Sequence, residues 1–304
     1  MAYLHSDREQ FRDAIDLAYE QTGVMVQAIE KDYYVTMLLR LLAQRMPYIV
    51  FKGGTSLSKC HKVIRRFSED IDITIDTLLS QGQKKKIKQA IVESAEELGM
   101  TIENLDETRS RRDYNRYVIA YDSVIPMASD ALKAAVLLET SYTAVSFPTV
   151  LLPVHSYIGD MMEQEAPDAI EEYNLNPFEM KVQGIDRTLA DKVFAVCDYY
   201  LQGKVAKHSR HLYDIYKLLP LVPQDENFKE LVKEVRAVRE RSVICPSALP
   251  EANVPELLEK IIKEKAYKQD YDSLTTQLLE ENVPYDTVIA TLKKVAESSI
   301  FENN

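Results

Sequence analysis

The spacing of apolar residues along the chain changes twice. Residues 6–46 have helical spacing and open with Ser6-Asp7-Arg8-Glu9, which has the form of a capping box. The turn-like residues 21–23 are expected to divide this region into two helices. A block of strand-like and helical segments follows, and after Asp186 the spacing is again helical, apart from a proline-rich loop at 244–255. This order predicts an α/β (α+β) protein in which a mixed β-sheet with flanking helices precedes an α-helical domain.

The middle block contains both strand and helix periods. The run YIVF at 48–51 is short and apolar, as in a buried strand. In DIDITI at 70–75, acids and isoleucines alternate with the period of a strand. Residues 83–99 form an amphipathic helical pattern that ends at a glycine. The other expected elements are a helix at 55–64, short strands between 101 and 155, and a strand at 178–185.

The composition is that of an ordinary globular protein. The chain has 304 residues, of which 46% are apolar and 28% are charged, and this length is enough for two modest domains. Its cysteines (Cys60, Cys197 and Cys245) form no CxxC pair, which favours a reducing compartment and argues against a zinc ribbon. The N-terminus lacks a signal-peptide pattern, and no apolar run approaches the roughly 20 residues that span a bilayer. We therefore expect a cytoplasmic protein without membrane contact.

The chain is acidic overall but includes two basic stretches. A formal net charge of -11 argues against a surface that binds nucleic acid generally, but not against a local basic groove. KKKIK at 84–88 is expected to be a solvated helix face. RSRRDYNRY at 109–117 combines arginines with tyrosines, a composition that binds phosphates and stacks bases.

Two aspartates are the first candidates for catalysis. Strand alternation places Ile71, Ile73 and Ile75 on one face, and Asp70, Asp72, Thr74 and Asp76 on the other. Because residues two apart on a strand are separated by roughly 6.6 Å, the carboxylates of Asp70 and Asp72 can converge on metal ions about 3.5–4 Å apart. Oxygen ligands favour Mg²⁺ or Mn²⁺ over zinc. The alternative is an edge strand with a solvated acidic face.

Gly53 and Gly54 stand between a predicted strand and a predicted helix. A helix that begins near Thr55 or Ser56 would present free backbone N–H groups, and glycine would let an anion approach them. A glycine pair alone is a weak signal and is compatible with a plain turn. A phosphate site followed closely by a metal-binding strand is a stronger one, because nucleotidyl transfer needs both.

Motifs in this region are similar to those of a known family. KGGTSLSK, followed by RRFSEDIDI, resembles the first two motifs of the nucleotidyl transferase AbiEii/AbiGii toxin family, part of the DNA-polymerase-beta-like nucleotidyltransferase superfamily. The family's RFSEDID is present unaltered at 66–72. Many superfamily members have Gly-Ser where this chain has Gly53-Gly54, although Thr55 and Ser56 supply hydroxyls.

The resemblance implies an enzyme class and its partners. Family members are the toxin halves of bacterial toxin–antitoxin and phage-defence modules. It implies a Mg²⁺-dependent nucleotidyltransferase that uses a nucleoside triphosphate (NTP) and has a cognate antitoxin. Two Mg²⁺ ions, or Mn²⁺ in their place, would be bound by the aspartates. Residues 1–184 would form the nucleotidyltransferase domain with its N-terminal helices, and residues 185–304 the helical domain that completes the cleft.

The resemblance also assigns site residues. TLADKVFAV and RHLYDIYKLL match the family's helical half. They single out Lys192, which would stabilise charge on the phosphates, and Asp214, which would orient Lys192 or the acceptor. Glu139, a lone acid in an apolar run, would be the third metal ligand found in the superfamily. The nucleotide would be bound by Gly53, Gly54, Thr55, Ser56, Lys59, Arg66 and Ser68.

Several of these residues also have a structural interpretation. Glu139 could stand at a strand end that reaches solvent. On a helix, Lys192 could pair with Thr188 or Asp191, or face water. Asp214 could form an ion pair with Arg210, four residues before it. His208 and His211 could share a metal ion, although no acid or cysteine lies at a zinc-binding spacing from them.

We expect the acceptor to be the 3′ hydroxyl of an RNA, with tRNA as the leading candidate because some relatives modify tRNA ends. The expected RNA contacts are Arg109, Arg111, Arg112 and Arg116, with Tyr114 and Tyr117 for base stacking. Alternatives are the same chemistry on a protein side chain, or a catalytically degenerate fold that only binds nucleotides. A remote alternative is a haloacid-dehalogenase-like phosphatase, whose DxDxT motif matches DIDIT but should follow an apolar run that is missing here.

Overall fold

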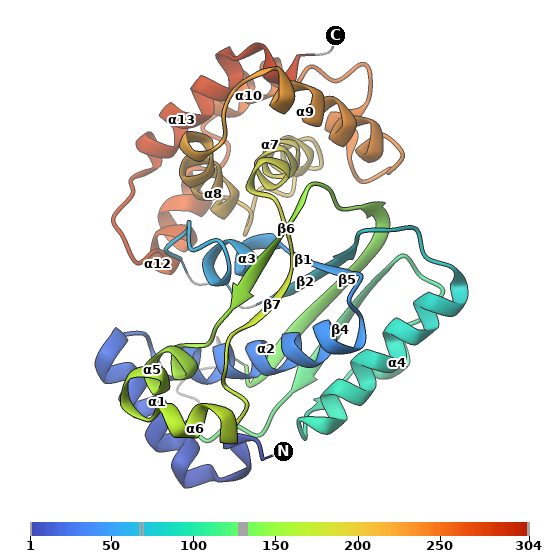
Figure 1. Ribbon diagram of the computed structural model, residues 1–304. Helices are drawn as coiled ribbons and strands as arrows, with labels where there is room; N and C mark the ends of the chain where they lie inside the picture. Colours follow the sequence, from blue (N-terminus) through green and yellow to red (C-terminus); the bar gives the residue numbers. More distant parts are fainter. Residues whose placement is uncertain (1, 67, 69, 127–132, 303–304) are drawn as a thin grey trace. The chain divides into compact units, whose positions relative to one another are not determined.

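The computed structural model describes residues 2–66, 68, 70–126 and 133–302 (Figure 1). Contacts within the chain define two compact units. Unit 1 comprises residues 1–60 and 68–182, and unit 2 comprises residues 61–67 and 183–304. The predicted boundary at 184/185 lies close to the last change of unit, between residues 182 and 183, whereas the short segment 61–67 was not predicted to belong with the helical half.

Unit 1 is built on a seven-stranded mixed sheet with the strand order β3-β4-β5-β2-β1-β7-β6. β2 pairs antiparallel with β1 and parallel with β5, and β1 also pairs in parallel with β7. β4 pairs antiparallel with β3 and β5. The strands are β1 Ile49–Lys52, β2 Ile71–Ile75, β3 Thr101–Ile102, β4 Tyr114–Ala120, β5 Ala135–Val145, β6 Thr149–Val154 and β7 Phe178–Gln183.

The alternation predicted for β2 is present in the structure. Ile71, Ile73 and Ile75 are buried in the core, whereas Asp72 on the other face is half-buried. β2 is an interior strand because β1 and β5 flank it. The alternative of an edge strand with a solvated acidic face is therefore wrong.

Helices α2 and α4 pack against the isoleucine face of the sheet. Leu38 of α2 and Ile87 and Ile91 of α4 join Ile71 and Ile73 in one hydrophobic core, and Figure 1 shows α2 crossing the strands and α4 running beside them. The helices of unit 1 are α1 Arg8–Thr22, α2 Val26–Arg45, α3 Gly53–Lys59, α4 Gln81–Glu97, α5 Tyr157–Glu165 and α6 Pro167–Glu172.

Local signals explain where the first helix begins and ends. Asp7, not the predicted Ser6, is the N-cap of α1, and its side chain accepts hydrogen bonds from two backbone N–H groups of the first turn. Gly23 ends the helix with a φ of 69°, at the predicted break. A capping box does occur at the start of α4, where Ser80 and Gln83 bond reciprocally.

Unit 2 is helical, as predicted. α7 packs against α8, α9 and α10, and α13 packs against α8 and α10. Its helices are α7 Ile185–Leu201, α8 Arg210–Leu218, α9 Glu226–Arg239, α10 Val254–Glu264, α11 Lys268–Asp270, α12 Thr276–Leu278 and α13 Tyr285–Glu297, with a π-helical turn at Tyr271–Thr275. Over the described ranges, no helix combines the length and the apolarity needed to cross a membrane.

The segment 61–67 is held in unit 2 by backbone contacts. Arg66 forms an isolated β-bridge with Leu279, and the carbonyl of Arg65 accepts a hydrogen bond of 3.0 Å from the N–H of Glu280. The N–H of Arg65 donates to the Tyr213 hydroxyl at 3.0 Å. The residues that lead into the RFSEDID motif are thus part of the helical unit.

Candidate active site

Gly53 makes room for the carboxylate of Asp72. The glycine is the first residue of α3 and has a φ of 81°, in the left-handed region that favours glycine. A Cβ added to Gly53 would lie 2.9 Å from Cγ of Asp72 and would overlap its carboxylate oxygen. The helix was expected to begin at Thr55 or Ser56 and to run to residue 64, but it spans Gly53–Lys59. Gly53 therefore lets the acidic strand pack closely against the first turn of this helix.

Hydroxyl groups brace this turn. The Ser56 hydroxyl donates to the carbonyl of Gly53 at 2.9 Å, and Oγ1 of Thr55 lies 3.0 Å from Oγ of Ser68. Both Thr55 and Ser56 are buried. The Thr55–Ser68 contact connects the turn to the residues that precede β2, so the glycine turn and the acidic strand are ordered together.

Lys59 makes its contacts inside the fold of unit 1. Its ammonium donates to the Asp32 carboxylate and to the carbonyl of His155, each at 2.5 Å, and the side chain is almost completely buried. The other carboxylate oxygen of Asp32 accepts from the N–H of Tyr157 at 3.0 Å. This network ties α3 to α2 and to the start of α5, so Lys59 acts as a brace in the structure.

Asp70 has a carboxylate oxygen that lacks a donor. The residue immediately precedes β2, and its Oδ1 is buried without a hydrogen-bond partner among the described residues. Leaving a buried acceptor unsatisfied costs about 1–3 kcal/mol, and more for a charged group. A bound cation is one way to offset this cost.

Glu139 lies beside Asp72 on the neighbouring strand. The two residues are partners in the parallel register of β2 and β5, so their side chains share a face of the sheet. Burial raises the pKa of Glu139, and the negative charges of Asp72 and Asp70 raise it further. The three carboxylates therefore act on one another electrostatically, and Glu139 is not the solvent-facing strand end of the alternative interpretation.

Two residues of β4 contact Glu139. A hydrogen-bond interaction with Tyr114 lowers the pKa of Glu139, and Nε of Arg116 lies 3.7 Å from its Oε1. Arg116 is the register partner of Glu139, and Lys52 is the partner of Asp72. The paired strands thus carry a row of charges in which two acids stand between two cations.

The acidic face fits a divalent cation bound chiefly by the two aspartates. In the part of the chain that the structure describes, no three His, Cys, Asp or Glu side chains are grouped closely enough to hold a metal ion. Mg²⁺ commonly takes only one or two protein carboxylates and completes its octahedron with water and substrate phosphates. The unpartnered oxygen of Asp70 and the close packing of Asp72 on Gly53 are compatible with such a site.

Asp214 is the centre of a buried charge cluster in unit 2. Its side chain is completely buried and accepts hydrogen bonds from Nε of Arg66 at 2.7 Å and from Nη2 at 2.9 Å. Nζ of Lys192 lies 2.9 Å from its Oδ2. The expected helix-surface pair of Asp214 with Arg210 is replaced by these two partners. Lys192 is largely buried and does not face water.

The cluster holds its groups in defined ionisation states. Burial alone would raise the pKa of Asp214, but Arg66 and Lys192 hold it well below its usual range. Burial lowers the pKa of Lys192, partly opposed by Asp214. Burial and the charge of Lys192 lower the pKa of His211 to about 3, so its imidazole is neutral. Nδ1 of His211 lies 3.1 Å from the Lys192 ammonium, which is incompatible with a metal shared by His208 and His211 through that atom.

The basic stretch 109–117 is partly engaged in local contacts. Arg109 donates to the backbone carbonyls of Asp106 and Thr108, and Arg112 donates to that of Glu107. Arg111 is exposed. Tyr114 is half exposed, but Tyr117 is buried in the core. Tyr117 therefore cannot stack on a base, and that expectation is wrong.

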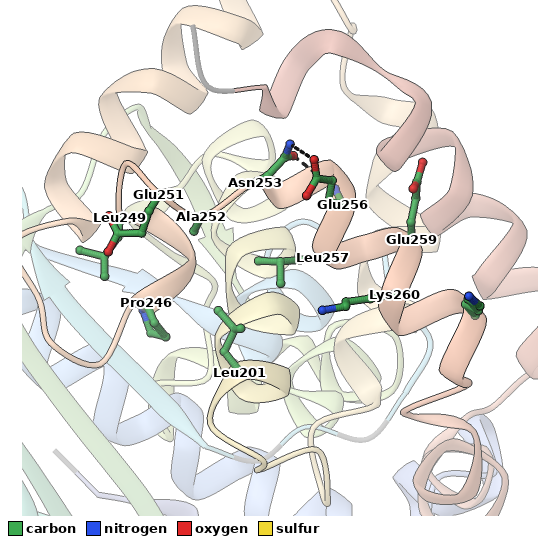
Figure 2. Close-up of a pocket in the computed structure, with 11 residues that line it drawn as sticks. Leu201, Pro246, Leu249, Glu251, Ala252, Asn253, Glu256, Leu257, Glu259 and Lys260 are labelled. Carbon is green, nitrogen blue, oxygen red and sulfur yellow. Dashed lines mark hydrogen bonds between the residues drawn. The ribbon is translucent and has the colours of Figure 1, made fainter.

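A cavity in unit 2 lies away from the cluster of Asp214. Its volume is about 660 Å³, and Figure 2 shows Leu201 of α7 and Leu257 and Lys260 of α10 at its wall. None of the predicted site residues lines it. The candidate chemistry belongs to the charged clusters and not to this hollow.

Comparison with known proteins gives two matches that bear on these clusters. A family model described as "Nucleotidyl transferase AbiEii toxin, Type IV TA system" matches residues 36–291. The fold is similar to that of MenT4, a nucleotidyltransferase toxin from Mycobacterium tuberculosis H37Rv, with a TM-score of 0.51 and 16% sequence identity over 93% of this chain and 88% of that one. None of the curated proteins matched the sequence.

For two residues of these clusters, the observed contacts differ from the role that the sequence predicted. Tyr114 was predicted to stack bases, but its hydroxyl contacts Glu139; its place two residues before Arg116 on a strand could have indicated a shared face. His211 was considered only as a metal ligand. Its position one turn before Asp214 on a helix could have indicated that both reach the same neighbour.

We expect Gly53→Ala to lower the free energy of unfolding by about 2–5 kcal/mol, through left-handed backbone strain and overpacking against Asp72. Gly23→Ala is the matched control, because Gly23 also has a positive φ but has open space around its Cβ position. Urea unfolding at constant pH measures both. Gly53→Ala should cost more unfolding free energy than Gly23→Ala, and most of this difference should disappear in an Asp72→Ala background. If the difference between the two glycine variants is the same with Asp72 and with Ala at position 72, the packing argument is contradicted.

Proposed function

Because the chain belongs to the AbiEii nucleotidyltransferase toxin family, we propose that it transfers a nucleoside monophosphate from an NTP to the 3′ hydroxyl of an RNA, with tRNA as the expected acceptor. The family defines the coarser part of this function. The protein is a nucleotidyltransferase and the toxin of a toxin–antitoxin pair, with an NTP as substrate and an antitoxin as partner.

One observation carries the proposal of a metal-assisted reaction. Asp70 and Asp72 stand at the start of an interior strand. Among the described residues, Asp70 has a buried oxygen without a hydrogen-bond partner, and Asp72 packs on the glycine turn. We assign both to Mg²⁺, with Mn²⁺ able to replace it. Among the described residues Glu139 is not grouped with both aspartates closely enough to make a three-ligand site, so we place it beside the metal and not among its direct ligands. Mg²⁺ bound there would supply charge neutralisation for the triphosphate and activation of the acceptor hydroxyl.

The turn beside these aspartates is assigned to the triphosphate. Gly53 is partly exposed and carries no side chain over the backbone, whereas Gly54 is buried, and the first N–H groups of a helix have no partner within the helix. Thr55, Ser56 and Ser68 support the turn through their hydroxyls. Lys59 and Arg66 are engaged with Asp32 and Asp214 respectively, so we assign them to supporting the site and not to direct contact with the nucleotide.

Lys192 is assigned to charge stabilisation on the phosphates. Two cations, Arg66 and Lys192, share the single carboxylate of Asp214. Arg66 donates to Asp214 twice, from Nε and Nη2 on one edge of its guanidinium, whereas Lys192 donates to it once. Because Arg66 already donates to both oxygens of this carboxylate, we propose that the positive charge of Lys192 serves the phosphates. Asp214 would orient this lysine.

Three alternatives lead to different outcomes. Transfer to a protein side chain would leave the chemistry unchanged and make the basic stretch 109–117 incidental. A degenerate module would bind NTP without turnover, which the presence of both aspartates and Lys192 argues against. A haloacid-dehalogenase-like phosphatase would carry its nucleophilic aspartate at the end of a buried strand, whereas Asp70 precedes β2.

We expect Asp70→Ala and Asp72→Ala each to abolish nucleotide transfer without unfolding the protein. Removing one carboxylate from a crowded acidic face relieves repulsion, so the melting temperature without metal should hold or rise. Asp76→Ala is the control, since Asp76 directly follows β2 and pairs with Lys181, and it should retain transfer. Transfer of labelled nucleotide and thermal unfolding measure the two effects. An active Asp72→Ala variant would contradict the metal-assisted mechanism.

Lys192→Met should lower kcat/KM for the NTP by about 10²–10³-fold, the usual loss for one electrostatic contact to developing charge. The methionine keeps the apolar stem, and Asp214 keeps Arg66 as its partner. Lys204→Met, at an exposed lysine of the same unit, controls for loss of charge and should be close to wild type. Steady-state kinetics over a range of NTP concentrations measures both. Equal rates for the two variants would remove Lys192 from the reaction.

Reversal of Arg111 and Arg112 to Glu should suppress labelling of RNA, with a smaller effect at high salt because screening weakens phosphate contacts. Lys85→Glu with Lys86→Glu is the matched control, since it makes the same charge change on exposed positions of α4 in the same unit. Labelled NTP and total cell RNA, incubated at two salt concentrations, provide the assay. Undiminished RNA labelling by the arginine variant at low salt would place the RNA contacts elsewhere, and label found only on protein would refute an RNA acceptor.

A further inference from the structure

The ammonium of Lys192 has two acceptors within hydrogen-bonding distance. Oδ2 of Asp214 is 2.9 Å away, and Nδ1 of His211 is 3.1 Å away. An ammonium has three N–H donors. No other described residue accepts a hydrogen bond from Lys192, so one donor remains after the contacts with Asp214 and His211. With two of the three directions occupied, the direction of the third is determined.

His211 acts toward Lys192 only as an acceptor. Burial, followed by the charge of Lys192, lowers the pKa of His211 to about 3, so its ring is neutral at any pH near 7. With an ammonium facing Nδ1, the ring proton belongs on Nε2. A neutral acceptor therefore adds no charge to the cluster.

The imidazole of His211 is held in place by aromatic stacking. Its ring lies nearly parallel to that of Tyr199, with centroids 5.7 Å apart and an interplanar angle of 10°. His208 stacks on the same tyrosine at 3.5 Å. Tyr199 and Lys192 lie about two turns apart on α7, on the face that meets His211 of α8. The stack therefore aligns His211 with the lysine it contacts.

We propose that His211 is a positioning residue for the nucleotidyl transfer: with Asp214, it fixes the rotation of the Lys192 ammonium and keeps it charged, so that one N–H remains for the triphosphate. This inference rests on the role given to Lys192 in the proposed function. His211 itself does not touch the substrate in this account. It acts through Lys192.

The charge balance around Lys192 explains why such an acceptor is needed. Burial lowers the pKa of Lys192, and Arg66 from segment 61–67 and Arg210 from α8 lower it further, whereas Asp214 raises it. His208, from the loop before α8, is neutral because burial and Arg210 lower its pKa. A hydrogen bond to the charged form of the lysine favours that form. His211 supplies this bond without a second carboxylate, which would cancel the positive charge the phosphates require.

The test compares His211→Asn, whose side-chain oxygen can take the place of Nδ1, with His211→Leu, which fills a similar volume but accepts no hydrogen bond. NMR of the lysine ammonium nitrogens, with the Lys192 signal assigned by Lys192→Arg, gives its titration midpoint without any substrate. We expect the midpoint of His211→Leu to fall by about one pH unit, the size of one hydrogen bond. That of His211→Asn should stay close to wild type.

The pH profile of kcat for the NTP is the second readout. Its basic limb should move to lower pH in His211→Leu and return in His211→Asn, a pattern that a purely structural role would not produce. Equal NMR midpoints in all three proteins, or an unmoved basic limb despite shifted midpoints, would overturn the inference. If wild-type protein transfers no nucleotide, the proposed function fails, while the NMR midpoints still decide whether His211 keeps Lys192 charged.

Discussion

The buried carboxylate of Asp214 is the interaction on which unit 2 and its proposed chemistry depend. A fully buried aspartate is unfavourable unless cations and hydrogen bonds compensate it, and here Arg66 and Lys192 do so at 2.7–2.9 Å. Arg66 belongs to the short segment that runs into the RFSEDID motif, and Lys192 belongs to α7. One acid thus fixes both the path of the chain before the acidic strand and the position of the lysine assigned to the phosphates.

Unit 1 has a corresponding constraint in the contact of Gly53 with Asp72. The glycine is needed for its positive φ and for the space that a side chain would take from the carboxylate. The same turn is assigned to the triphosphate, so the residue that admits the metal ligand also keeps the backbone open. This explains why one of the 8 glycines of the chain stands at position 53.

The sequence predicted those features that depend on local periodicity or on a contiguous motif. The alternation in β2, the break at Gly23 and the helical second half follow from apolar spacing and turn residues, and the motifs indicated the family. Contacts between residues distant in sequence were not accessible in this way. Asp214 was compared with Arg210 because the rule for helices considers near neighbours, whereas its real partners come from segment 61–67 and from α7. Lys59, beside the glycine turn, was assigned to the nucleotide, but its ammonium pairs with Asp32. Tyr117 is buried although Arg116 beside it is exposed. Burial and long-range pairing decide these cases, and neither is visible in a local pattern.

The central claim is that the acidic strand and the lysine serve nucleotidyl transfer and not another reaction of triphosphates. Parallel incubations with NTP labelled at the α-phosphate and at the γ-phosphate, in the presence of Mg²⁺ and total cell RNA, test it most directly. The account predicts that the α-label becomes covalently attached to RNA, while the γ-label leaves in pyrophosphate. Attachment of the γ-label to any acceptor, or its release as orthophosphate with no α-label transferred, would contradict the account.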